Sequence, residues 1–284
     1  EKTSPTFVKK GGCNSCHNQM LPAAAQAFAR KRGIATNETI FQLPPEANEF
    51  TTERLIEYSM FGANSVGYEL FSHAMVGRPH DARIGAQVNY LKALQQPDGA
   101  WQTTGNRPPL TFDDYTTTAF AILALQTYTT PVQREDHQAR IARARSWLLE
   151  AQPETTQERG FHLLGLAWSS AGKEALAKAS RGLRKMQRKD GGWSQLPGMP
   201  SDAYATGIAL YALHHARVPA ADPVYRSGLQ FLLDTQRPDG TWHVKTRSLP
   251  FQPYFESGYP YGHDQWISAA GSAYAIMAIA AAVE

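Results

Sequence analysis

A seven-residue motif, Gln-x-x-Asp-Gly-x-Trp, occurs three times and constrains the fold more than any other feature of the chain. The copies span residues 95–101, 187–193 and 236–242. A weaker fourth copy begins at Gln152, where a helical pattern runs into a Pro-containing turn. Internal repetition at this spacing is typical of folds that stack one helical unit several times.

Each copy of the motif ends a helical pattern. Apolar residues recur at helical spacing before the turn, as at Val88, Leu91 and Leu94. This spacing predicts helices over 83–95, 140–152, 174–187 and 224–236. The Asp-Gly pair predicts a turn, because Gly accepts a positive φ. We expect the Trp to cover the helix end and the Gln amide to bond to the free carbonyls there.

A second type of helix follows three of the turns. These helices begin at Asp114, Asp202 and Asp264, and each Asp fits an N-cap. Small residues such as Thr118 and Gly207 permit close helix packing, so we expect these to be inner helices and the first type to be outer helices. Because no convincing strand pattern occurs, the sequence predicts an all-α fold, an α/α toroid over 51–284 preceded by a short N-terminal segment over 1–50.

These repeats resemble the QW motifs of the prenyltransferase and squalene-hopene cyclase fold over residues 52–284. Class II terpene cyclases protonate their substrate with the middle Asp of an Asp-x-Asp-Asp motif. The nearest string here, residues 111–114 (TFDD), lacks the first Asp. We therefore interpret Asp113 and Asp114 as a capping pair and expect that the chain is not a terpene cyclase. The toroid has no Cys for a prenyltransferase zinc site, and Glu256 and Asp264 are its candidates for a glycosidase carboxylate pair.

The two cysteines of the chain, Cys13 and Cys16, are followed directly by His17. Cys-x-x-Cys-His is the attachment signature of c-type haem. It predicts one covalent haem c, with thioether bonds to both cysteines and His17 as an axial iron ligand. We assign Gly12 and Asn18 to the same site, and Tyr259 to its wall. The whole chain also resembles bacterial proteins that join such a segment to these repeats, in strings such as GGCNSCHNQMLPA, SDAYATG and FESGYPYGHDQW.

Other roles for the cysteine pair fit less of the sequence. A thioredoxin-like dithiol would lie in a βαβ setting, and no such pattern is present. A zinc site would need further ligands at suitable spacing. A disulfide across so short a loop would stabilise little.

Three long loops, over 102–112, 194–201 and 243–263, are expected to gather at one mouth of the toroid. The last is rich in Pro and aromatic residues, which suits either a porphyrin face or the cover of its own core. The candidates for a sixth iron ligand are His243, Met75, Met60 and His263, and further residues are His73, His80 and Met199. We favour His243 or Met75, and an open sixth position would favour peroxidase-like chemistry.

The composition excludes some classes of protein. A net charge of +3 and a pI near 8.8 do not indicate a nucleic-acid binder. The apolar stretch over 267–283 is short for a transmembrane span and is interrupted by Ser and Gly. The chain starts at Glu1 without a signal peptide, so a periplasmic or extracellular bacterial location implies a leader that is absent from this chain.

The expected function is that of a secreted or periplasmic monohaem cytochrome that transfers electrons, with the toroid as scaffold for haem and docking. Its expected partner is a redox protein, and a role as a subunit of a larger redox assembly is compatible with this. The basic face of an outer helix either docks such a partner or is simply solvated. That face comprises Lys178, Arg181, Lys185, Arg188 and Lys189. The alternatives are a haem enzyme (peroxidase-like, or a dehydrogenase subunit) and a binding module for lipid, glycan or protein.

Overall fold

A computed structural model describes residues 3–11, 15–36, 62–105, 107–250 and 253–283. Over these residues the secondary structure is helical, apart from isolated β-bridges that join Arg107 to Thr111 and Ser194 to Ser201. The all-α prediction is confirmed.

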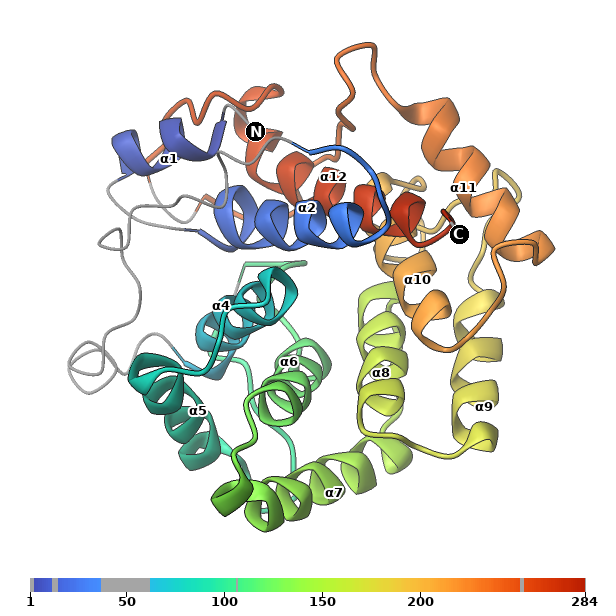
Figure 1. Ribbon diagram of the computed structural model, residues 1–284. Coiled ribbons are helices and arrows are strands. Elements are labelled where there is room, and N and C mark those ends of the chain that lie inside the picture. Colours follow the sequence, from blue (N-terminus) through green and yellow to red (C-terminus); the bar gives the residue numbers. More distant parts are fainter. Residues whose placement is uncertain (1–2, 12–14, 37–61, 106, 251–252, 284) are drawn as a thin grey trace.

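A ring of inner helices forms the core of the molecule. Each inner helix packs against the next, and α12 packs against α2, so the ring is closed (Figure 1). The inner helices are α2 (Leu21–Lys31), α4 (Ala63–Val76), α6 (Asp114–Thr127), α8 (Thr156–Trp168), α10 (Ala203–His215) and α12 (Gln265–Ala280).

The outer helices lie outside this ring. α9 packs against α8, whereas α5, α7 and α11 each contact two consecutive inner helices. They are α5 (Ala82–Leu94), α7 (Arg134–Glu150), α9 (Lys173–Arg184) and α11 (Pro223–Thr235). All four predicted outer helices are confirmed, although α7 begins at Arg134 instead of residue 140. Its first turn is polar, with Glu135 and Asp136 at the positive end of the helix dipole, so apolar spacing could not reveal it.

The N-terminal part of the chain adds α1 (Thr3–Gly11), a short π-helical turn η1 (Cys16–Met20) and α2. The helix α2 lies between α12 and α4 in the inner ring. The predicted domain boundary at residue 50 lies outside the described residues and stays a prediction. Short 3-10 turns precede α7 (η4, Pro131–Gln133) and α12 (η5, Gly262–Asp264).

The Trp of each repeat ties the end of an outer helix to the next inner helix. The indole Nε1 of Trp193 donates to the carbonyl of Leu183 at 2.9 Å, and its backbone N–H donates to the hydroxyl of Thr206 on α10 at 2.9 Å. Trp101 makes the same pair of bonds to the Leu91 carbonyl and the Thr118 hydroxyl. Trp242 makes them to the Leu232 carbonyl and the Ser272 hydroxyl. The prediction that the Trp covers the helix end is confirmed.

The Gln of each repeat has a different partner from the one expected. In each copy its amide donates to the Gly carbonyl of the turn, at 3.0 Å from Gln95, 2.8 Å from Gln187 and 3.1 Å from Gln236. The helix-end carbonyl is already bonded to the Trp indole. The Gln amides of the first two copies reach the following outer helix as well, at the carbonyls of Arg140 and Val224.

Small residues let the inner helices approach closely. A Cβ atom placed on Gly207 of α10 would lie 2.6 Å from the carbonyl carbon of Tyr274 in α12. Because that neighbour is backbone, it cannot rotate aside as a side chain would. Gly85 of α5 differs, since a Cβ there meets only the His80 ring, at 3.4 Å.

Gly207→Ala should therefore lower the free energy of unfolding by about 1–3 kcal/mol, because α10 and α12 must separate. Urea denaturation at 25 °C measures the change. Gly85→Ala is the matched control and should be neutral or stabilising by up to about 1 kcal/mol, since Ala is the better helix former. Equal effects of the two substitutions would contradict this explanation of Gly207.

Candidate functional site

The three long loops meet at one mouth, next to the N-terminal ends of α6, α10 and α12. Arg247 in the last loop donates from Nε to the side chain of Gln195 in the second loop, at 3.0 Å. The amide of Gln157, in the first turn of α8, donates to the carbonyl of Pro109 in the first loop at 2.6 Å. The expected gathering of these loops is confirmed.

A buried carboxyl group, Asp113, lies at this mouth as the N-cap of α6. One oxygen accepts from the Thr116 backbone N–H at 2.7 Å and the other from the Thr116 hydroxyl at 2.9 Å and the Gln157 amide. Gln157 in turn accepts from the Tyr204 hydroxyl at 2.7 Å. Burial raises the pKa of Asp113 to about 6, because loss of water outweighs the bonds that favour the charged form.

A second carboxyl, the half-buried Asp202, has closely similar surroundings as the N-cap of α10. It accepts from the Ala205 backbone N–H and from the Gln195 amide, both at 2.9 Å. Burial likewise raises its pKa to about 6. Its capping role was predicted correctly, whereas the cap of α6 is Asp113 and not Asp114. Asp264 holds the N-cap position of α12, but its carboxylate bonds to the loop residues Thr246 and His243.

The raised pKa of Asp113 makes stability depend on pH. An unfolded Asp titrates near 3.8, whereas the folded group titrates near 6. Asp113 therefore favours the folded state most at low pH, and this contribution is lost as the pH rises through about 6. Asp113→Asn should gain about 2–2.5 kcal/mol of unfolding free energy relative to the unsubstituted protein between pH 4 and pH 7.

Urea titrations at several pH values measure this difference. Asp239→Asn is the control for which the pH dependence of stability should have the opposite sign. Hydrogen bonds that Thr241 donates lower the pKa of that exposed carboxyl. The stability of Asp239→Asn relative to the unsubstituted protein should decrease as the pH rises. A difference for Asp113→Asn that does not change with pH would contradict the assigned environment.

Aromatic side chains surround the interior near Asp113. Tyr68, Tyr204 and Tyr274 are fully buried, and the negative charge of Asp113 contributes to the raised pKa of each hydroxyl, after burial itself. The rings of Tyr204 and Tyr274 meet edge to face with centroids 5.4 Å apart. Phe120 continues the cluster, 4.8 Å from Tyr68. The acid therefore lies beside a wall of π-systems.

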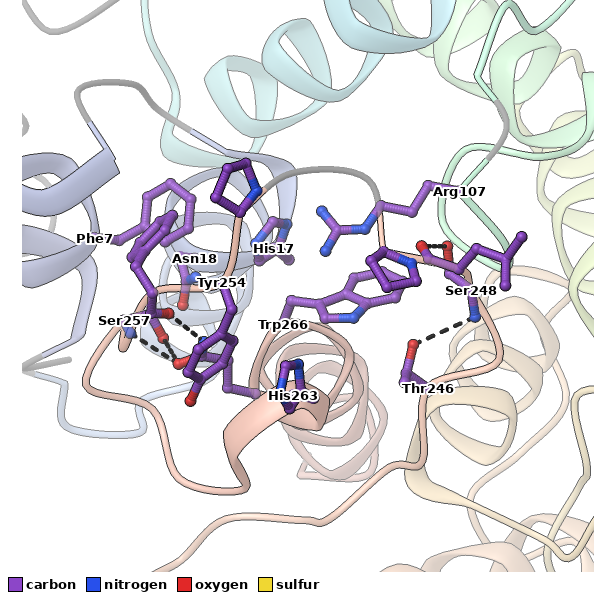
Figure 2. A pocket seen from close by; sticks show the side chains of 15 residues that line it. Phe7, His17, Asn18, Arg107, Thr246, Ser248, Tyr254, Ser257, His263 and Trp266 are labelled. Carbon is purple, nitrogen blue, oxygen red and sulfur yellow. Dashed lines mark hydrogen bonds between the residues drawn. The ribbon is translucent and has the colours of Figure 1, made fainter.

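A cavity of about 520 Å³ opens at the mouth, above the start of α12 (Figure 2). Side chains of α1, η1, the first loop, the last loop and α12 line it. Gln265 holds the last loop in place, because its side-chain oxygen accepts from the backbone N–H of Ser257 at 2.8 Å while its amide donates to the carbonyl of Phe255 at 2.6 Å. The residues that line the cavity include Phe7, His17, Arg107, Tyr254, His263 and Trp266.

His17 is a buried, uncharged side chain in the wall of this cavity. Its ring meets Phe7 edge-on at 5.4 Å between centroids, and Trp266 at 5.9 Å. Burial, together with the nearby charge of Arg107, lowers its pKa to about 3. Burial raises the pKa of the neighbouring Cys16 to about 12, so that thiol is protonated at neutral pH.

Arg107 brings a positive charge to the cavity. Its guanidinium carbon lies 3.9 Å from the centroid of the Trp266 ring, and the side chain extends toward His17 (Figure 2). Burial lowers its pKa to about 10, so it stays charged at neutral pH. Its Nε is buried without a hydrogen-bond acceptor among the described residues.

The structure brings together three of the residues that the sequence proposed for one site. His17, Asn18 and His263 all line the cavity, and His263 stacks on Tyr254 with ring centroids 4.3 Å apart. Cys16 lies beside them on η1, whereas Gly12, Cys13 and Met60 fall outside the described residues.

The other proposed residues lie outside the lining of the cavity. His243 is exposed, pairs with Asp264 at 2.8 Å and stacks on Tyr261. The hydroxyl of Tyr259 donates to the hydroxyl of Ser272 at 2.6 Å. Met75 is half-buried against the core near the C-terminal end of α4. Their assignment to an iron site stays a prediction without support from this geometry.

Sequence reasoning missed Arg107, Trp266 and Gln157 as site residues. Arg107 lies in one of the three long loops, directly before two prolines. This position was the one feature of the sequence that could have singled it out. Trp266 and Gln157 stand in the first turns of inner helices, where side chains face the mouth. Only the folded ring reveals that these turns meet.

Comparison with known proteins gives terpene cyclases. No family model matches the chain. The chain is 29% identical over 193 residues to a drimenyl diphosphate synthase of Streptantibioticus cattleyicolor, a match that covers 61% of this chain and 34% of that protein. It is 26% identical over 171 residues to a squalene–hopene cyclase of Bradyrhizobium diazoefficiens, covering 60% of this chain and 22% of that protein. The matches thus span about a third or less of these relatives.

A solved structure agrees in fold. A type II terpene cyclase from Scytonema, in complex with geranylgeranyl dihydroxybenzoate, superimposes with a TM-score of 0.56 at 13% identity. The similarity covers 92% of this chain and 87% of that one. At this level of identity the likeness concerns the fold.

These findings contradict the expected function. The relatives and the solved structure named above are cyclases, so they point to an enzyme of the cyclase kind and away from an electron-transfer cytochrome with haem c, iron and a redox partner. The haem-enzyme and binding-module alternatives lose their basis with it, and excluding a terpene cyclase for want of a full Asp-x-Asp-Asp was wrong. Within the described residues no group of three or more His, Cys, Asp or Glu side chains could hold a metal ion.

The physical reason for the error is the shortness of the motif. Cys-x-x-Cys-His spans five residues, and its described part packs as protein interior at the entrance to an inner helix. Ser15 caps η1 through a bond from the Asn18 backbone N–H, and His17 fits between Phe7 and Trp266. Packing alone thus accounts for the side chains of Cys16 and His17.

The basic face predicted on an outer helix is present on α9 and the turn after it, where all five side chains are exposed. No helix of the described part has both the length and the apolar character of a membrane span. A periplasmic or extracellular location stays a prediction. The chain has the α/α-toroid fold of the terpene and squalene–hopene cyclases.

Proposed function

We propose that this chain is a cyclase that begins the reaction by protonating a polyene substrate, with Asp113 as the general acid. The observation that carries the proposal is a buried carboxyl group of raised pKa at the start of an inner helix, beside an aromatic wall. The cyclase names of the similar proteins support the reaction class.

The position of Asp113 in the sequence supports its role. In the Asp-x-Asp-Asp motif of class II cyclases the middle Asp delivers the proton, and Asp113 occupies that place in the string TFDD. Thr111 replaces the first Asp, so one carboxylate of the family pattern is missing. Burial performs part of the same task here, because it keeps a fraction of Asp113 protonated near pH 6.

The aromatic wall suits the cation that protonation would create. Addition of the Asp113 proton to a carbon–carbon double bond leaves a carbocation, and aromatic faces attract cations. Tyr68, Tyr204 and Tyr274 supply such rings close to the acid. Successive attack by the other double bonds closes the rings, and loss of one proton ends the reaction. The product is therefore an isomer of the substrate.

Access to the acid requires a local movement. Gln157 bonds both to Asp113 and to the carbonyl of Pro109, so its side chain covers the carboxyl group. The segment from Arg107 to Asp113 joins the wall of the mouth cavity to the acid. In this proposal a substrate enters from the cavity, displaces the Gln157 amide and places its terminal double bond against Asp113.

Incubation in D₂O tests the proposed reaction directly. The purified protein is mixed separately with squalene, farnesyl diphosphate and geranylgeranyl dihydroxybenzoate, and extracts are analysed by gas or liquid chromatography with mass spectrometry. The expected product from at least one substrate is cyclic, retains any diphosphate group and carries one deuterium from solvent. Consumption of none of the three, or a product formed with diphosphate release and no deuterium, would overturn the proposal.

A further inference from the structure

The mouth cavity contains a cation without a partner. Within the described part of the chain, the Nε of Arg107 is buried without a hydrogen-bond acceptor, and the side chains that line the cavity include no carboxylate. The guanidinium contacts the face of Trp266, at 3.9 Å. A half-buried charge that lacks an acceptor is unfavourable, so the fold retains an electrostatic cost that an anion would relieve.

The residues around Arg107 favour an anion over a cation. None of the described side chains that line the cavity is an aspartate or glutamate. His17 is neutral, because burial and the charge of Arg107 lower its pKa to about 3. The charge that the described lining supplies is therefore that of Arg107.

One wall of the cavity is apolar, and the cavity is roomy. Phe7 and Phe255 pack with ring centroids 5.1 Å apart, and Tyr254, Pro253 and Leu249 extend this wall. At about 520 Å³ the cavity is within the range that small-molecule sites occupy. Figure 2 shows Phe7 and Tyr254 on the side opposite Arg107. A bound molecule thus meets a charge at one end and aromatic rings at the other.

We infer that this cavity binds an amphiphile with an anionic head, a carboxylate or a phosphate, through Arg107, and holds its apolar body against Phe7, Phe255 and Trp266. The guanidinium offers forked N–H donors to either head group while stacked on Trp266. The proposed reaction uses the same cavity as its entrance, but its acid lies outside the cavity lining, and binding is measurable without turnover.

Two fluorescent probes that differ by one charge test the inference. The anion 8-anilino-1-naphthalenesulfonate and the neutral N-phenyl-1-naphthylamine share the same ring system. The protein should bind the anion at least about 10-fold more tightly at pH 7 and low salt. Arg107→Gln should remove that difference, because it lowers the affinity for the anionic probe and leaves the affinity for the neutral probe unchanged. Arg107→Lys should restore part of it, because the charge returns without the planar stack.

The control is Arg247→Gln, a half-buried arginine at the same mouth that bonds to Gln195 and does not line the cavity. It should leave both probe affinities unchanged within about twofold, and thermal unfolding checks that each variant is folded. Displacement of the anionic probe by decanoate or by decyl phosphate identifies the head group. The inference would be overturned if the unsubstituted protein bound the two probes with equal affinity, or if Arg107→Gln left the affinity for the anionic probe unchanged. It would also be overturned if decanol displaced the anionic probe as well as decanoate and decyl phosphate do.

Discussion

Asp113→Asn is expected to abolish cyclisation, with kcat/KM lowered by at least about 10³-fold. Asn matches Asp in size and is a good N-cap, so the bond from the Thr116 backbone and the start of α6 should survive. What the amide cannot do is deliver an acidic proton. The loss therefore reports the acid itself and not the helix that carries it. Product formation from a consumed substrate, followed by mass spectrometry, measures the rate.

Asp202→Asn is a matched control for this substitution. Asp202 also caps an inner helix, also bonds to a glutamine amide and also has a pKa raised to about 6 by burial. It differs in not standing in the TFDD string. We expect its kcat/KM to fall by less than about 10-fold. If both variants lost activity equally, or neither did, a role of Asp113 as the acid would be excluded.

The pH profile gives an independent measure of the same group. A general acid acts in its protonated form, and the raised pKa of Asp113 places its titration near pH 6. The rate should therefore decrease above pH 6, because the carboxyl loses its proton, and level off below it. A rate that rises with pH through this range would indicate a base in place of an acid.

The repeats made most of the fold predictable from sequence. Gln-x-x-Asp-Gly-x-Trp encodes a local structure, since the Trp indole closes its own helix and the Gly permits its own turn. Small residues in the next helix then encode its close packing. The helix α8 was not predicted, because it opens without the Asp and small residues of the other inner helices. Its signal was the capping box of Thr155 and Glu158.

The site was less predictable, because its members come from distant parts of the chain. Arg107 and Trp266 meet only when the ring closes, and no local pattern in either segment indicates the other. Asp113 was recognised as a cap, and it is one; its raised pKa depends on burial under Gln157, which lies on another helix. The five-residue haem signature was misleading because it is local. A short local pattern carried the functional prediction without any constraint from the packing around it.

Trp193→Ala is expected to lower the free energy of unfolding by about 4 kcal/mol, the largest effect on stability among these substitutions. The side chain is fully buried, and its loss removes the indole bond to Leu183 as well as the ring. Trp193→Phe should cost less, about 1–2 kcal/mol, because it keeps most of the packing and leaves one carbonyl without its donor. Val132→Ala, at a 95% exposed residue, should change stability by less than about 0.5 kcal/mol.

A double substitution separates packing from general damage. A Cβ on Gly228 of α11 would lie 2.9 Å from the Trp193 ring and 2.8 Å from Leu210, so Gly228→Ala should destabilise the protein. With Trp193 replaced by Ala, one of these two clashes disappears and the added methyl group fills part of the void. Gly228→Ala should then cost at least about 1 kcal/mol less than in the presence of the Trp. Additive effects in urea denaturation would show that the Trp193 ring does not occupy the space that Gly228 leaves, and would contradict the assigned packing of the repeat.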